Sequence, residues 1–155
     1  MRAKIRSILF VLFISVGTLA GYIFWLNFRP VEIVAVHHRS GGFSAVLVKN
    51  FPLTDKGKIY WWLENSKNIG EKYQIPLPDK DGSFYLTFWL FGEGYKREGK
   101  YDRLCFNDMN TPENCIDKNA VFSVENTRDK EIIFTVYDGR YLMKKDGNIL
   151  KLKYD

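Results

Sequence analysis

The chain has 155 residues, with 23 Lys and Arg against 18 Asp and Glu and a net charge of +5. Hydrophobic residues make up 46% and charged residues 26%, which excludes a disordered chain, a collagen-like chain and a disulfide-dense mini-protein. The length fits one folded domain. Four basic and no acidic residues lie within the first 30 positions, so the rest of the chain has a net charge of only +1. We therefore expect no nucleic acid among the partners.

An uncharged and mostly apolar run occupies residues 7–28, between Arg6 and Arg29. A helix of this length spans about 33 Å, which is enough to cross a bilayer core. We interpret residues 7–28 as an uncleaved transmembrane helix and residues 1–6 as a short tail. A cleaved signal peptide is the alternative, because Thr18-Leu19-Ala20 fits a cleavage site, but the chain stays apolar beyond it.

The charges that flank this run predict its orientation. Arg2, Lys4 and Arg6 precede the helix, and the positive-inside rule then places the N-terminus in the cytoplasm and residues 31–155 across the membrane. Gly17 and Gly21 match the GxxxG pattern that lets two membrane helices pack closely, which would give self-association. Glycine is also common in membrane helices generally, and this second interpretation is the one that we favour.

The first half of the exported part reads as a hairpin followed by a helix. Residues 31–36 and 43–48 have strand patterns, with a turn at 39–42 between them. Thr54 is the expected N-cap of a helix that ends near Gly70. Its apolar face is expected to comprise Ile59, Trp62, Leu63, Ser66 and Ile69.

The second half is rich in strand patterns. Residues 83–91 are apolar at both alternating sets of positions, which predicts a central strand covered on both faces. Further strands are expected over 101–106, 121–124, 131–137, 140–144 and 148–154, with a polar loop at 107–114 and turns at Asp138-Gly139 and Asp146-Gly147. In the last strand, Lys151 and Lys153 should be exposed to solvent. The alternate positions should be buried: Leu150, Leu152 and Tyr154. The fold class is α+β: one N-terminal transmembrane helix followed by a mainly antiparallel sheet of six to eight strands with one principal helix.

The two cysteines, Cys105 and Cys115, both lie in the exported part. In an oxidising compartment such a pair is usually a disulfide, and a free pair is the alternative. No further ligands stand at zinc spacing, and the CxxC pattern of redox proteins is missing from the sequence.

Three other patterns suggest sites that we consider weak. Residues 94–100 fit GxxxxGK, but Tyr101 replaces the magnesium-binding Ser or Thr, so we expect a charged turn rather than a phosphate site. His37 and His38 are neighbours on a strand, point to opposite faces, and are expected to be solvated. The oxygen-bearing residues of the cysteine loop lack EF-hand spacing, so we expect a solvated loop without calcium: Asp108, Asn110, Glu113 and Asp117. No metal and no cofactor is expected.

The sequence also lacks the GxSxG, HExxH and SxxK patterns of common hydrolases, so we expect a protein that is not an enzyme. A hydrolase that uses scattered carboxylates is the alternative. Trp61 and Trp62 differ by about 100° in direction on a helix, so both cannot lie at the centre of its buried face. Trp62 fits the buried stripe, which leaves Tyr60 or Trp61 at its edge. Such a residue is either an aromatic anchor for a partner or a side chain covered by loops. The candidate partner-binding residues are Tyr60 and Trp61, with Tyr95, Lys96 and Arg97 of the charged turn.

Six segments of the chain form a distinctive set: residues 29–37 (RPVEIVAVH), 46–52 (VLVKNFP), 54–59 (TDKGKI), 61–65 (WWLEN), 98–106 (EGKYDRLCF) and 133–139 (IFTVYDG). With these segments the chain resembles a bacterial family of unknown function, domain of unknown function nine-four-three. Family members are small membrane proteins of Gram-negative bacteria, which implies the inner membrane for the anchor and the periplasm for residues 31–155. The family has no established catalytic residues to carry over.

Some genes of this family look like companions of secreted antibacterial toxins, which implies an immunity role. We therefore expect an inner-membrane-anchored periplasmic binding protein without catalysis, whose protein partner is a toxin. The alternative is an envelope accessory or signalling subunit that assembles through its transmembrane helix.

Overall fold

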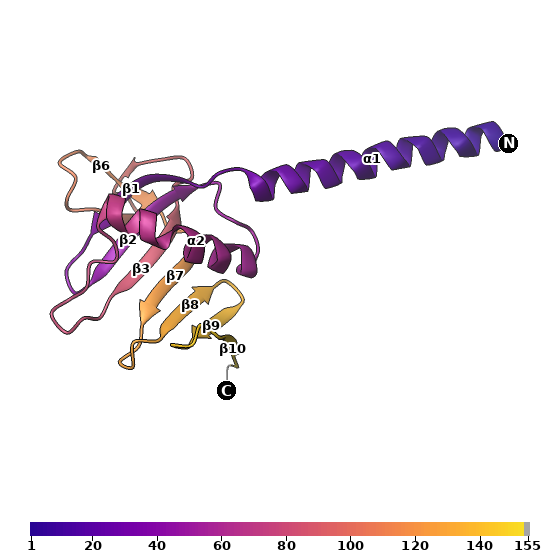
Figure 1. The fold of residues 1–155 in the computed structure, drawn as a ribbon. Coiled ribbons are helices and arrows are strands. Elements are labelled where there is room, and N and C mark those ends of the chain that lie inside the picture. Colours follow the sequence, from indigo (N-terminus) through magenta and orange to yellow (C-terminus); the bar gives the residue numbers. More distant parts are fainter. Residues whose placement is uncertain (154–155) are drawn as a thin grey trace. The chain divides into compact units, whose positions relative to one another are not determined.

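The computed structural model describes residues 1–153 and divides the chain into two compact units, Met1–Pro30 and the part from Val31 onward. The first unit is helix α1, Arg2–Phe28 (Figure 1). From Arg2 to Leu26 it is long and apolar enough to cross a membrane. The helix starts before residue 7 and so includes the basic residues of the expected tail. Arg29 is extended, as expected for a residue before proline, and ends the helix.

A sheet with seven strands in the described part of the chain organises the second unit, in the order β1-β2-β3-β7-β8-β9-β10 (Figure 1). Its strands are β1 (Glu32–His38), β2 (Phe43–Lys49), β3 (Tyr85–Leu90), β7 (Ala120–Asn126), β8 (Ile132–Val136), β9 (Gly139–Met143) and β10 (Ile149–Leu152). Neighbours pair antiparallel except β2 and β3, which are parallel because a helix carries the chain back between them. The expected α+β class is confirmed.

Helix α2, Asp55–Tyr73, begins as expected at Thr54, whose hydroxyl oxygen accepts a hydrogen bond of 3.0 Å from the Gly57 amide. Gly70 lies near the end of α2, as expected, but does not itself end it, because the helix continues to Tyr73 and Gln74 follows in the left-handed conformation. Gly70 serves a different purpose. A Cβ atom there would lie 2.9 Å from the Ile75 carbonyl oxygen, so glycine lets the chain leaving the helix pass close to it.

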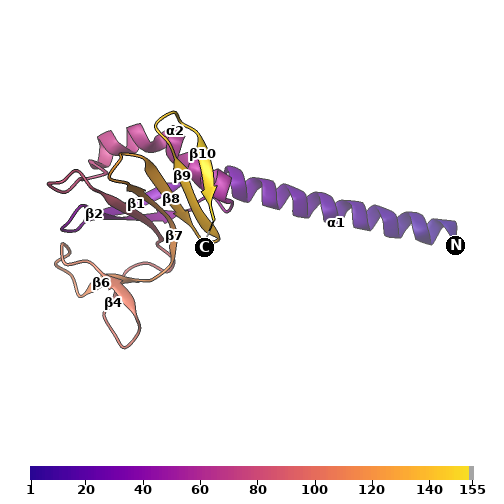
Figure 2. The same cartoon turned by 90° about the horizontal axis from the view of Figure 1, so that it is seen from below.

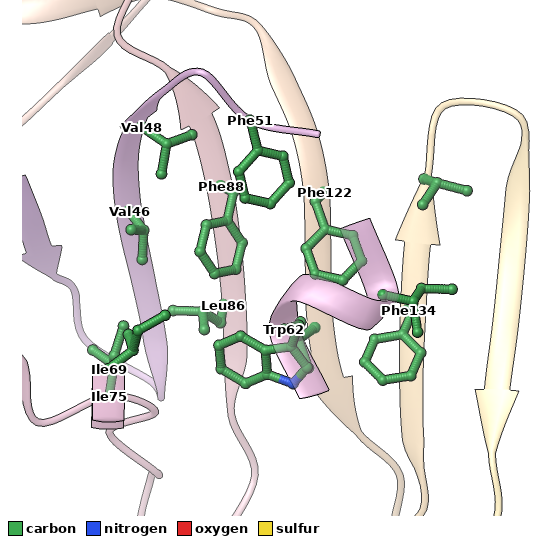
Figure 3. Close-up of a cluster of buried hydrophobic side chains, with 13 residues drawn as sticks. Val46, Val48, Phe51, Trp62, Ile69, Ile75, Leu86, Phe88, Phe122 and Phe134 are labelled. Atoms are coloured by element: carbon green, nitrogen blue, oxygen red, sulfur yellow. The ribbon is translucent and has the colours of Figure 1, made fainter. Parts of the chain in front are cut away.

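One face of the sheet packs against α2 to form the larger core. Trp62 and Ile69 of the helix meet apolar side chains from β2, β3, β7 and β8, together with Phe51: Val46, Val48, Leu86, Phe88, Phe122 and Phe134 (Figure 3). Leu63 was expected in this core but is 42% exposed, because the helix turns that position past the edge of the packed strands.

A small three-stranded sheet covers the opposite face. Its strands are β4 (Lys96–Arg97), β6 (Glu113–Asp117) and β5 (Arg103–Cys105), in that order. Its side chains Leu104, Phe106 and Ile116 pack on Ala45 and Leu47 of β2, so α2 and the small sheet lie on opposite sides of the large one (Figure 2). The central strand β3 is therefore covered on both faces, as expected. The expectation of a loop through residue 114 is wrong, since β6 starts at residue 113.

The C-terminal hairpin of β9 and β10 differs from expectation. Lys151 pairs with Tyr141 and Ile149 with Met143, so Ile149 and Lys151 point to the α2 side. Leu150 points to the opposite side and is 47% exposed, because neither buried core reaches β10. The expected burial of Leu150 is therefore wrong, and Tyr154, which was expected in the same strand, lies outside the described residues.

Candidate functional site

An apolar groove runs between the first half of α2 and the hairpin of β9 and β10. Its cavity volume is about 720 Å³. The helix supplies one wall and the hairpin the floor, with these lining residues: Lys56, Gly57, Ile59, Tyr60, Leu63, Tyr141, Ile149 and Lys151. Tyr60 is 63% exposed and Leu63 42%. Large apolar side chains that line one open groove are typical of a binding surface.

The register of the strands explains why the groove is apolar. The cross-strand pairing of Lys151 with Tyr141, and of Tyr141 with Phe134, places all three side chains on the face that bears α2. Phe134 lies under the helix and is fully buried. Tyr141 lies one strand further out, at the edge of the core under the helix, and Ile149 lies two strands out and is 38% exposed. The uncovered end of a core face therefore becomes the floor of the groove.

Polar contacts fix the groove and leave its lysines unpaired. The Tyr141 hydroxyl donates a hydrogen bond of 3.1 Å to the Asp55 carboxylate, which ties the hairpin to the start of α2. A hydrogen bond to Glu64 and the charge of that carboxylate raise the pKa of the Tyr60 phenol. Lys56 and Lys151 form no ion pair with the residues that the structure describes. The Lys151 ammonium instead lies 5.6 Å from the centre of the Tyr141 ring.

The hairpin that floors the groove is also strongly basic. Residues 139–153 contain five basic residues and one acidic residue, a net charge of +4. The rest of the exported part, with 14 basic and 17 acidic residues, has a net charge of −3. Of the five basic residues, Lys151 lines the groove, whereas Arg140 donates a hydrogen bond of 2.7 Å to Glu125.

A buried polar cluster centred on His37 lies on the opposite side of the large sheet. His37 Nδ1 is 2.8 Å from an Asp108 carboxylate oxygen, and Nε2 is 2.9 Å from the Tyr95 hydroxyl. The ring stacks on Phe106, with 3.8 Å between ring centres. His37 is buried, so the expectation that both histidines are solvated is wrong for His37, while His38 is exposed as expected.

The hydrogen bonds of this cluster occupy both nitrogens of the imidazole. A carboxylate oxygen accepts, so Nδ1 donates to Asp108, and the Tyr95 hydroxyl is the partner of Nε2. Burial, followed by the charge of Asp108, raises the pKa of the Tyr95 phenol. Tyr95 precedes β4 and Asp108 follows β5, so the cluster fastens the small sheet onto β1. We interpret its arrangement as structural.

The five candidate partner-binding residues do not form one surface. Tyr60 lies in the groove, whereas Trp61 packs edge-on against Phe51 and Phe88 at the border of the larger core. Lys96 and Arg97 form β4 of the small sheet, on the opposite side of the large sheet (Figure 2), and Tyr95 directly precedes β4 on that side. Of the five, the groove contains only Tyr60. Sequence reasoning missed the exposed apolar residues Leu63 and Ile149 of the groove; Leu63 was missed because its position fits the buried stripe of α2.

The acidic residues of the cysteine loop are engaged with other side chains. Asp108 contacts His37, and Glu113 accepts a hydrogen bond of 2.6 Å from Arg97. Asp117 accepts hydrogen bonds from Lys96 at 2.6 Å and Arg103 at 3.0 Å. These donors lower the pKa values of the Glu113 and Asp117 carboxyls. Within residues 1–153, no group of three or more His, Cys, Asp or Glu is placed to hold a metal ion.

The remaining sequence-based candidates are the two cysteines and the two glycines of α1. Cys105 and Cys115 face each other across β5 and β6 and form a disulfide, with the two sulfur atoms 2.06 Å apart. Gly17 and Gly21 lie on α1, where an added Cβ atom would meet nothing within 4 Å. Helix packing through these glycines stays a prediction.

A comparison with known protein families matches residues 2–153 to the family described as "Enterobacterial putative membrane protein (DUF943)". No curated protein and no solved structure matches the chain.

Proposed function

Since the chain belongs to the enterobacterial membrane-protein family DUF943 over residues 2–153, we propose that it is a membrane-anchored binding protein that holds a protein partner without catalysing a reaction. Helix α1 is the anchor in this proposal. The anchor lies in the inner membrane, with the N-terminus in the cytoplasm and the folded domain in the periplasm in this proposal, and the positive charges before α1 support that orientation. The partner is a secreted antibacterial toxin, and the protein provides immunity to it.

The observation that carries the proposal is the apolar groove beside α2. Tyr60, Leu63 and Ile149 expose apolar surface in a concave site, where burial by a partner is favourable at about 25 cal/mol per Å². Aromatic residues in a groove are also common binding hot spots. A binding protein needs only such a surface on a rigid domain, and the core under α2 supplies that rigidity.

The polar groups support a role without catalysis. A general base needs a ring nitrogen that can reach a substrate proton. Both nitrogens of His37 are engaged within the fold, and His38 Nδ1 lies 3.3 Å from the Ser44 hydroxyl. The carboxylates of the cysteine loop are paired with His37 and with basic side chains. These residues therefore serve the fold of the domain.

Site-specific photo-crosslinking in the native host tests the proposal. A photoreactive amino acid at Leu63 should cross-link to a polypeptide, because this side chain lies in the groove. The matched control is Leu77, which is 48% exposed in the loop that follows α2 and lies outside the groove. It should give no such product.

Co-expression with the neighbouring toxin gene tests the immunity role. Cells that produce the protein should survive, and Leu63→Glu should remove the protection. The proposal is overturned if cells are killed despite normal amounts of the protein and Leu63 gives no cross-link.

A further inference from the structure

We infer that the occupant of the groove is an amphipathic helix of the partner, apolar on one side and acidic along its edges. This inference rests on the proposed function and specifies the chemistry of the partner segment. Three observations carry it: the width of the floor, the two lysines that have no ion pair within residues 1–153, and the positive net charge of the hairpin.

The dimensions of the groove fit a helix. Strands lie about 4.8 Å apart, so the floor of β9 and β10 is about 10 Å wide, which is the diameter of a helix with its side chains. One helix covers only part of a wide sheet: the buried residues under α2 come from β2, β3, β7 and β8, and Tyr141 and Met143 of β9 pack at the edge of that core. The groove is the vacant place beside α2 where a second helix of the same layer would pack.

The charges select an acidic occupant. Lys56 stands on the α2 wall and Lys151 on the floor, and neither has a carboxylate partner among the described residues. The nearby carboxylates interact with tyrosine hydroxyls instead, Asp55 with Tyr141 and Glu64 with Tyr60. The hairpin has a net charge of +4. Glutamates at the edges of a bound helix would therefore meet unpaired ammonium groups.

Two other occupants fit these observations less well. A second copy of the chain in a two-fold contact would bring the same positively charged groove residues together. A membrane surface is bound by protruding apolar side chains, whereas this site is concave and needs an occupant that projects into it.

Synthetic peptides test the inference with the full-length protein in nanodiscs of zwitterionic lipid. The probe is a labelled helical peptide of about 20 residues with leucines at helical spacing and glutamates beside them. One control has lysine in place of every glutamate, and a second arranges leucine and glutamate in strand-like alternation. Fluorescence anisotropy should show that the acidic helix binds at least about tenfold tighter than either control.

Variants locate the binding. Leu63→Glu and the double substitution Lys56→Glu with Lys151→Glu should each weaken binding of the acidic helix by about tenfold or more, and the double variant should gain affinity for the basic peptide. All three positions are on the surface, and circular dichroism checks that the fold is kept. Lys80→Glu, an exposed position in the loop that follows α2 and outside the groove, is the matched control and should leave binding unchanged.

Each contrary result overturns the inference. Equal binding of the acidic and basic helices, or no binding of either, would exclude an acidic helix as the occupant of the groove. Tighter binding of the alternating peptide shows strand addition at the edge of β10 instead. If the peptide binds in nanodiscs of zwitterionic lipid but not in nanodiscs with anionic lipid at the same ionic strength, the lipid surface occupies the groove. If Leu63 cross-links to a polypeptide and any of these results is found, the proposed binding function stands and only the inference that the occupant is an acidic helix fails.

Discussion

At the scale of single residues, the least expected feature is the burial of His37. Adjacent strand residues point to opposite faces, so one of His37 and His38 had to face the small sheet once that sheet was present. The stacking on Phe106 and the two hydrogen bonds then replace what the imidazole loses by leaving water. The polar partners are 58 and 71 residues away in the chain, so no local pattern indicates them.

Replacement of His37 by alanine should lower the free energy of unfolding by about 2–4 kcal/mol, because the change opens a cavity beside Phe106 and removes the partners of Asp108 and Tyr95. Denaturant unfolding followed by tryptophan fluorescence measures the loss. His38→Ala is the matched control on the same strand. Its side chain is exposed, and we expect a change of less than about 0.5 kcal/mol. Equal effects of the two substitutions would contradict a structural role for the cluster.

At the scale of secondary-structure elements, the small sheet depends on cross-links between short strands. The strands β4, β5 and β6 have two, three and five residues. They are joined by the Cys105–Cys115 disulfide and by the contacts of Asp117 with Lys96 and Arg103. Such short strands bury little apolar surface of their own, so these links should matter more than they would in a long hairpin.

Replacing both cysteines by serine should destabilise the domain by about 2–4 kcal/mol, because the disulfide closes a loop of ten residues in the unfolded chain. The melting temperature, measured with and without a reducing agent, tests this. The reducing agent should lower the melting temperature of the wild type and leave the serine variant unchanged. A wild type that is insensitive to reduction would show that the bond contributes little.

The stability of the small sheet should also fall in acid. Hydrogen bonds from Lys96 and then Arg103 lower the pKa of Asp117. A lowered folded-state pKa gives stabilisation that is present above the unfolded-state pKa and is lost as the pH falls through the folded-state value, here below about pH 4. The denaturant concentration at the unfolding midpoint, measured from pH 6 to 2.5, should fall with decreasing pH. The fall should be less steep in Asp117→Asn than in the wild type. Asp129→Asn, whose carboxylate has no ion pair within residues 1–153, should keep the wild-type slope.

The elements differ in how well the sequence predicts them. The helix α2 and the strands β1, β2 and β3 follow from local signals, namely the Thr54 cap and the alternation of apolar residues. The β6 strand has only Cys115 and Ile116 as buried residues, which is too short a pattern to read. The groove was also beyond prediction. Leu63 fits the apolar stripe of α2, so the sequence predicts that it is buried. Its exposure follows from the tertiary structure, in which β9 and β10 form the floor of the groove and no residue of β10 belongs to the core.

At the scale of the whole molecule, the net charge of +5 separates into parts with different consequences. Four basic residues flank the apolar helix, and residues 139–153 contribute +4, while the rest of the exported part is acidic overall with −3. A single pI near 9.1 therefore combines charges that support the proposed membrane orientation with charges near the proposed binding groove. The position of the charges, and not their sum, supports the two proposals.

The orientation of the anchor gives the last prediction. Arg2, Lys4 and Arg6 resist translocation, so the N-terminus should stay in the cytoplasm and the domain should be exported. Alkaline phosphatase fused to the C-terminus, which is active only after export, should be active, and a green fluorescent protein fused there should stay dark. Replacing the three residues by glutamate should lower the phosphatase activity by severalfold. The same replacement at Lys144, Lys145 and Lys153 should have no effect on export, because charges so far from the helix do not set its orientation. A fluorescent C-terminal fusion would reverse the topology and place the groove in the cytoplasm, out of reach of a partner that acts in the periplasm.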